Sequence, residues 1–184
     1  LYGMTLLLKA DDGAIYAVNV VTDDNVTIYD KGVHIYRFAD ETSGRTTDPT
    51  LIFNTQIGRG GQRWGDSFAV RGSGATTQIL LGSGNNLEAG LDPADNTSVC
   101  LFTVNDPTFS SSTSLTANPS LIGNIGDYRS GIAFGPGNSF YGKCGPQQAT
   151  IAAQDLRYAT FDGTTYAATQ QNDFALPGDA INMS

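Results

Sequence analysis

The chain has 184 residues, enough for one domain with a sizeable core, and a formal net charge of −8. Charged residues make up only 15% of it, against about 25% in a typical soluble domain, and Glu and Lys are scarce beside Asp, Thr, Asn and Gly. This composition argues against a helical bundle, a coiled coil and a doubly wound α/β fold. The acidity and the scattered basic residues argue against nucleic-acid binding.

The composition also bears on where the protein acts. No apolar run approaches the roughly 18 residues of a membrane span. The chain opens at Leu1 without an initiator Met or a basic and apolar leader, so we expect a processed or excised N-terminus. Low Lys, high Thr, Asn and Gly, and strong acidity predict an extracellular or cell-surface protein.

The first predicted unit consists of apolar runs separated by turn residues. Two strands, 3–8 and 15–18, flank a tight turn at Asp11-Asp12-Gly13 and predict a hairpin. A third strand over 36–40 runs from an aromatic residue to an Asp, and a weaker fourth strand follows at 49–53.

The same order of elements returns twice. The predicted strands of the later units are 65–70, 78–81, 102–106 and 119–123, then 131–134, 139–141, 158–162 and 174–177. Gly178 opens a further copy. The predicted units therefore span 3–64, 65–125 and 126–177, with 178–184 starting another, all within one domain over 1–184.

Four strands per unit, recurring about every 50 to 65 residues, are typical of β-propeller blades. We predict an all-β, β-propeller-like fold of about three four-stranded blades, as an incomplete ring or part of a larger assembly; a β-sandwich is the alternative. The units differ most in Thr22–Gly32, Gly84–Ser98 and Gly145–Asp155, before each third strand. Such insertions map to loops on one face, often a binding face.

The stretch Arg63–Gly74, with sequence RWGDSFAVRGSG, resembles repeats of uncharacterised secreted bacterial propeller-like proteins. The chain lacks the Gly-His and Trp-Asp pairs of WD40 repeats and the double glycine of kelch repeats. The resemblance covers most of the chain. It implies a fold and a location, but no activity that can be carried over to a residue here.

Three aspartates, Asp66, Asp127 and Asp179, occupy equivalent positions in successive units. Paired carboxylates near a propeller axis would suit glycoside hydrolysis. Alternatively, each Asp accepts backbone N–H bonds at a strand entry. Repetition favours this structural interpretation, because catalysis needs carboxylates in different environments. Asp40, Asp106 and Asp162 are predicted to start the turns after the third strands.

The cysteines leave two interpretations open. Cys100 and Cys144 pair in a disulfide if the compartment is oxidising, or pack as two buried free thiols. His34, the only histidine, occupies the same position in its unit as Cys100, which favours a packed strand position over a catalytic one. Two cysteines and one histidine cannot by themselves complete a zinc site.

Aromatic and cationic residues flank two of the first-strand entries. Arg63, Trp64, Tyr128 and Arg129 could stack on a sugar ring, although a lone Trp also suits a core. They are the candidate ligand-binding residues.

The expected site chemistry includes no cofactor or metal. Ca²⁺ is a weaker alternative at the acidic loop residues Asp23, Asp24, Asp92 and Asp95, which lack an EF-hand spacing. Asn25, Asn96 and Asn182 fit the N-glycosylation pattern.

These observations predict a non-enzymatic extracellular scaffold or a recognition module for glycan or protein. The alternatives are a carbohydrate-active enzyme that uses the aligned aspartates, and a structural subunit of a filament or surface layer. Three blades would leave flanks exposed, with apolar residues such as Ile15, Val18, Ile132 and Phe140 poorly covered. We therefore expect the partner to be the rest of a longer propeller or copies of the chain itself.

Overall fold

The computed structural model describes residues 5–19, 33–55, 63–84, 99–120, 127–145, 155–161, 166–167 and 174–175. These residues form β-strands with very little helix, which confirms the predicted all-β class. The strands of the first half are β1 (Thr5–Lys9), β2 (Ile15–Asn19), β3 (Val33–Phe38), β4 (Thr50–Thr55), β5 (Arg63–Arg71) and β6 (Gln78–Gly84). They are followed by β7 (Val99–Val104), β8 (Leu115–Ser120), β9 (Asp127–Phe134), β10 (Ser139–Gly145), β11 (Asp155–Phe161), β12 (Tyr166–Ala167) and β13 (Phe174–Ala175). The described helices are α1 (Ser43–Thr46) and the 3₁₀-helix η1 (Gly74–Thr76).

The strands form three antiparallel sheets, each a meander in which consecutive strands pair. Sheet A has the order β1-β2-β3-β4, sheet B the order β5-β6-β7-β8, and sheet C the order β9-β10-β11-β12, with β13 also paired to β11. Each sheet falls within one predicted unit, except that β5 begins at Arg63, two residues before the predicted boundary. In the described part of the chain the sheets close neither a barrel nor a propeller ring.

Several predicted strands are displaced. The third strands were expected to start at residues 36, 102 and 158, whereas β3, β7 and β11 each start three residues earlier. The fourth strand along sheet C is β12, at a position where we predicted no strand. We expected the fourth strand of the second unit over Pro119–Gly123, whereas β8 spans Leu115–Ser120. The backbone N–H of Asn105 donates to the Ser114 carbonyl at 2.8 Å, which closes the preceding loop. Pairing between β7 and β8 therefore starts immediately afterwards, at Val104 opposite Leu115.

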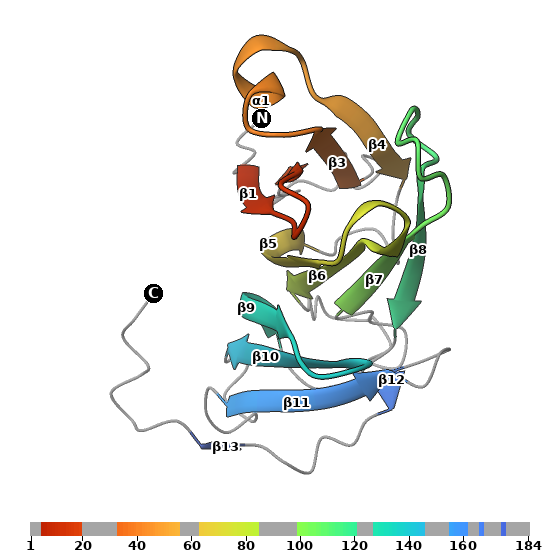
Figure 1. Cartoon of the computed structure of the whole chain (residues 1–184). Helices are drawn as coiled ribbons and strands as arrows, with labels where there is room; N and C mark the ends of the chain where they lie inside the picture. The colour runs from red at the N-terminus through yellow and green to blue at the C-terminus, as the bar shows by residue number, and fades with distance from the viewer. Residues whose placement is uncertain are drawn as a thin grey trace.

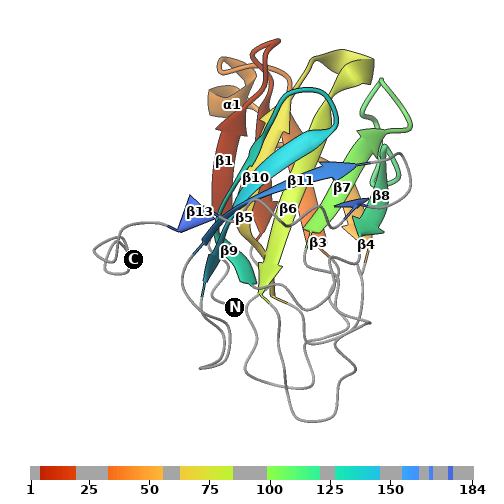
Figure 2. The same cartoon turned by 90° about the horizontal axis from the view of Figure 1, so that it is seen from below.

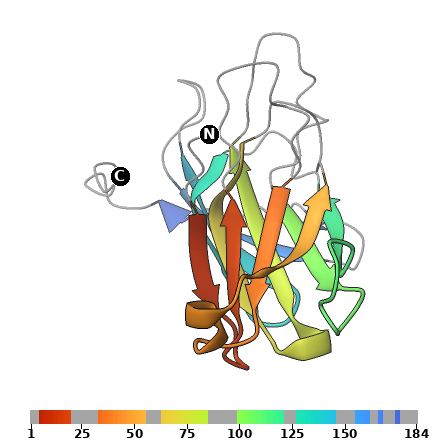
Figure 3. The same ribbon diagram turned by 90° about the horizontal axis from the view of Figure 1, so that it is seen from above.

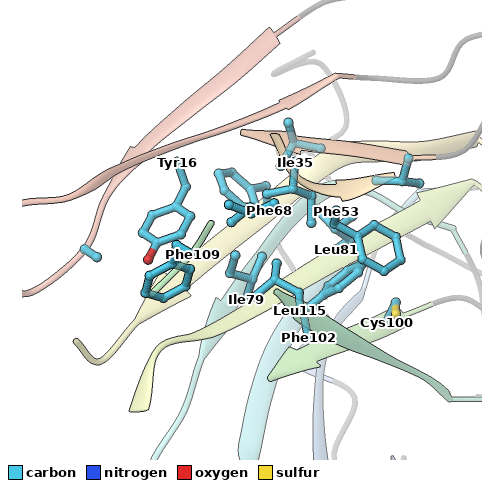
Figure 4. Close-up of a cluster of buried hydrophobic side chains, with 14 of the residues drawn as sticks. Tyr16, Ile35, Phe53, Phe68, Ile79, Leu81, Cys100, Phe102, Phe109 and Leu115 are labelled. Atoms are coloured by element: carbon cyan, nitrogen blue, oxygen red, sulfur yellow. The ribbon is translucent and has the colours of Figure 1, made fainter. Parts of the chain in front are cut away.

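The sheets stack face to face in the order A, B, C (Figure 1). Because side chains alternate along a strand, the central sheet B presents apolar residues on both faces. On β6, Ile79 and Leu81 belong to the core shared with sheet A, whereas Leu80 belongs to the core shared with sheet C. Sheet A contributes Tyr16, Ile35 and Phe53 to the first core (Figure 4). Val18 belongs to the same core.

This packing corrects part of the expectation about exposed flanks. Val18 and Phe140 are completely buried, and Ile132 packs against the core between sheets B and C. Side chains alternate between the two faces of a strand, and these three positions lie on the face that packs against a neighbouring sheet. Of the four residues named, only Ile15 lies on an outer face.

The first strands β1, β5 and β9 follow one another along one side of the stack (Figure 1). The hairpin turns β1–β2, β5–β6 and β9–β10 all lie at the same end, as Figures 2 and 3 show. We call this the turn end. In a meander, the second strand runs from the hairpin turn back to the opposite end of the sheet. The strands that start at this opposite end are β3, β5, β7, β9 and β11. We call that opposite end the entry end.

Candidate functional site

Hydrogen bonds between hairpin turns hold the sheets together at the turn end. The Asp11 carboxylate accepts from the Gly72 N–H at 2.8 Å, and the Asp12 carboxylate accepts from the Gly74 N–H at 3.0 Å. Burial raises the pKa of Asp12, but N–H bonds from Ala14 and Gly74 and the charge of Arg37 outweigh it, so its pKa is lowered overall. These bonds attach the first turn of sheet A to the first turn of sheet B.

A second contact attaches sheet B to sheet C at the same end. The Arg71 guanidinium donates to the Gly135 carbonyl at 3.2 Å and lies 4.2 Å from the centroid of the Phe134 ring. Its Nε also donates to Gln78 within sheet B. At the turn end, hydrogen bonds therefore link sheet A to sheet B and sheet B to sheet C.

The entry end carries the predicted ligand-binding residues. Arg63 and Trp64 start β5, and Tyr128 and Arg129 lie next to the start of β9. The two strands are neighbours in adjacent sheets. The fold therefore brings the backbones of both pairs to the same end, although the structure does not describe their side chains.

Two of the three aligned aspartates lie at irregular points of β5 and β9. The pairing register of β5 with β6 shifts between Trp64 and Ser67, so Asp66 lies in an irregular stretch of the ladder. Asp127 is the first residue of β9, whose pairing with β10 also shifts nearby. The side chains of Asp66 and Asp127 are not described, and Asp179 lies outside the described residues. Their catalytic and structural interpretations both stay open.

Asp40 and Asp106 start the turns after β3 and β7, as predicted. The Asp40 carboxylate accepts from the Ser43 N–H at 2.8 Å, and this bond lowers its pKa. The Asp106 carboxylate accepts from the Thr108 hydroxyl at 2.7 Å and the Thr108 N–H at 2.9 Å, and also from Ser110. These bonds lower the pKa of Asp106 to about 2. Asp162 lies outside the described residues.

We expect the Asp106 carboxylate to titrate near pH 2 in the folded protein. Its unfolded pKa is higher, so its stabilising effect is complete above about pH 4 and is lost as the pH falls towards 2. Carboxyl carbon NMR across pH 1.5 to 6 measures this midpoint, with Asp106→Asn identifying the signal. A midpoint near 4 would show that the hydroxyl and N–H bonds of this loop do not form in solution.

Cys100 and His34 lie on equivalent strands in different surroundings. Cys100 is a free thiol, completely buried between sheets A and B, and burial raises its pKa far above the ordinary value. This matches the free-thiol interpretation for Cys100 rather than a disulfide with Cys144, whose side chain is not described. His34 is half-buried on β3, with its ring edge-on to Tyr36.

We expect Cys100 to resist modification in the folded protein. In a Cys144→Ser variant, a thiol reagent at pH 8 should label less than a tenth of Cys100 in an hour, and all of it after unfolding in guanidinium. The reason is that a buried neutral thiol is inaccessible and unreactive. A control at pH 9.5 should remain unlabelled, because burial raises the pKa of the thiol. Rapid native labelling would contradict the described packing.

The other sequence-predicted residues lie outside the described part of the chain. They are the calcium candidates Asp23, Asp24, Asp92 and Asp95 and the glycosylation candidates Asn25, Asn96 and Asn182. Among the residues that are described, no three His, Cys, Asp or Glu side chains gather as a metal site. No helix in the described ranges has the length and apolarity to cross a membrane.

The structure also contains a hollow that we did not predict. It lies on the outer face of sheet A and has a volume of about 630 Å³. Its lining comprises Leu7, Ile15, Ala17, Asn19, Tyr36, Phe38, Glu41, Gly44, Arg45 and Pro49. Apolar side chains of β1, β2 and β3 form most of its surface, while Glu41 and Arg45 add charge. Lys9 beside it pairs with Glu41 at 3.0 Å.

The sequence did contain a signal for this hollow. Leu6-Leu7-Leu8 and Ile15-Tyr16-Ala17-Val18 are apolar at both alternating positions, which is typical of strands covered on both faces. Sheet B covers only one face of sheet A, so the apolar residues on the other face line the hollow.

A comparison of the chain with known protein families, curated proteins and solved structures found no match. The resemblance to secreted bacterial repeat proteins therefore stays a hypothesis.

Proposed function

We propose that the chain is a non-enzymatic, extracellular recognition module with β-propeller-like architecture, which binds a glycan at its entry end. The observation that carries this proposal is the stack of three four-stranded meanders with their first strands adjacent and their hairpin turns at one end. Propeller blades are four-stranded sheets repeated around an axis in this way.

The arrangement of the two ends supports a binding role. Turn-to-turn contacts through Asp11, Asp12 and Arg71 stabilise the turn end. The segments that differ most between the predicted units all connect strands at the entry end. Variable connections on a rigid scaffold commonly carry recognition.

The residue types at the entry end favour a sugar ligand. Arg63 and Trp64 on β5, and Tyr128 and Arg129 on β9, place aromatic and cationic residues on neighbouring strands. Aromatic rings offer an apolar surface for sugar rings, and guanidinium groups donate several hydrogen bonds to oxygen acceptors. A protein ligand at the same end is the alternative.

A glycan array followed by calorimetry tests the proposal. We expect Trp64→Ala to weaken binding of the best glycan about tenfold or more, and Trp64→Phe to weaken it less, because the aromatic face is kept. Ala75→Glu, at the exposed turn end, should leave it unchanged. Absence of any glycan binding, or binding unaffected by Trp64→Ala, would contradict the proposed site.

A carbohydrate-active enzyme is the second candidate, because Asp66 and Asp127 lie near the starts of neighbouring strands. If Asp66 is structural, Asp66→Asn should lower the free energy of unfolding by about 1 kcal/mol or more. An unchanged melting temperature together with the loss of a glycan-cleaving activity would favour the enzyme.

A further inference from the structure

Sheets B and C each have a face directed towards the sheet that precedes them in the stack. Sheet B uses Phe68, Ile79 and Phe102 on that face to pack against sheet A. Sheet C uses Phe134 and Phe140 to pack against sheet B. These faces are well covered, and Ile79, Phe102 and Phe140 have no exposed surface.

The outer face of sheet A corresponds, by the register of its first hairpin, to the face that sheet C directs towards sheet B. Equivalent backbone bonds close two of the hairpins, from Ala10 N–H to the Ala14 carbonyl and from Gly135 N–H to the Ser139 carbonyl. The next pair outward is Lys9 with Ile15 in sheet A, and Phe134 with Phe140 in sheet C. Ile15 therefore occupies the strand position in sheet A that Phe140 occupies in sheet C. In sheet C, this position faces the preceding sheet.

This face of sheet A continues as an apolar row. Leu7 pairs with Ala17, and Ala17 pairs with Tyr36, so the three side chains share the outer face of β1, β2 and β3. Leu7 is 61% exposed, and among the side chains that the structure describes no other large hydrophobic residue is as open. The hollow of about 630 Å³ lies over the row.

From this equivalence we propose that the outer face of sheet A docks sheet C of a second copy of the chain, head to tail. The occupant must present the face that sheets A and B each direct towards the following sheet. In sheet C that face carries Ala133, which is exposed and lies between the inward-facing Ile132 and Phe134. The α1 segment already covers part of this face, since Gly44 lies against Ile15 and Phe38. The new interface is therefore centred on Leu7, Ala17 and Tyr36, which line the open hollow.

A head-to-tail contact joins two different faces, so every copy keeps one unused face of each kind. Such contacts grow until they close a ring or extend as a filament. This inference concerns the stacked sheets alone and does not depend on glycan binding at the entry end.

Light scattering after gel filtration, on Leu7→Glu and Ala133→Glu variants, tests the contact. We expect the wild-type chain to form oligomers larger than a dimer as its concentration rises. Each variant alone should be monomeric, with association weakened about a hundredfold or more, because a carboxylate is costly to bury against an apolar face. Mixed together, the two variants should form a dimer and nothing larger, since one intact face remains on each.

Ala75→Glu, which adds the same charge at the exposed turn end, is the matched control and should assemble like the wild type. Circular dichroism verifies folding, and Leu7→Ser replaces Leu7→Glu if that variant unfolds. A wild-type chain that stays monomeric would overturn the proposal and leave the face to another partner. So would assembly that persists in Leu7→Glu, or a mixture that fails to dimerise.

Discussion

Replacing Phe102 with Ala should lower the free energy of unfolding by about 3 to 5 kcal/mol. Phe102 has no exposed surface and lies in the core between sheets A and B (Figure 4). Its ring meets Phe53 edge to face, with centroids 4.9 Å apart. Truncation leaves a cavity between two sheets whose turns are bonded to each other, so the surroundings can collapse only in part. Urea unfolding followed by circular dichroism measures the loss.

Two further variants make this prediction specific. Leu7→Ala, on the outer face, should change stability by less than about 0.5 kcal/mol in a monomeric sample. In a double-mutant cycle, Phe53→Ala and Phe102→Ala should show a coupling of about 0.5 to 1.5 kcal/mol. A loss below about 1 kcal/mol for Phe102→Ala would mean that sheets A and B do not share this core.

The repeat pattern predicted most of the strands because the signals are local. Apolar runs of four to six residues, bounded by Gly and Asp, define both strands of each first hairpin. Ile79-Leu80-Leu81 is apolar at both alternating positions, and this sheet is indeed covered on both faces. The start of β8 was missed because Asn105 and Ser114 fix it through a loop closure that leaves no apolar signal.

The contacts between sheets could not be predicted, because they join residues far apart in the chain. Asp11 meets Gly72 across 61 positions, and Arg71 meets Gly135 across 64. The sequence shows only that Asp11-Asp12-Gly13 and Gly72-Ser73-Gly74 are turns. The stacking of the sheets brings the carboxylates of the first turn to the N–H groups of the second.

The contacts of Arg37 also could not be predicted from the sequence. Its Nε donates to the Tyr16 hydroxyl at 3.1 Å, and its guanidinium lies 4.4 Å from the centroid of the Phe109 ring. Phe109 has a φ of 51°, which is unusual for a non-glycine residue, and its side chain is buried. The loop between β7 and β8 thus contacts sheet A through an aromatic and cationic cluster that the repeat pattern does not contain.

Gly72 is the residue at which the turn end is most constrained. Its φ of 79° belongs to the left-handed region, and a Cβ at this position would overlap the Thr76 carbonyl oxygen. Its N–H also donates to the Asp11 carboxylate at 2.8 Å. Gly74, two residues later, has a φ of 48° but no atom within 4 Å of an added Cβ. A substitution at Gly74 therefore introduces backbone strain alone, whereas a substitution at Gly72 introduces both backbone strain and steric overlap.

We expect Gly72→Ala to lower the free energy of unfolding by about 2 to 4 kcal/mol, and Gly74→Ala by about 1 kcal/mol. Both variants place an alanine in the left-handed region, but only the first must also displace the Thr76 backbone. That displacement weakens the bond to Asp11, so Asp11→Ala should cost less in a Gly72→Ala background than in the wild type. Urea unfolding of the four variants measures these differences. Equal losses for the two glycines, or fully additive effects of Gly72→Ala and Asp11→Ala, would show that the turn of sheet B does not hold the turn of sheet A as described.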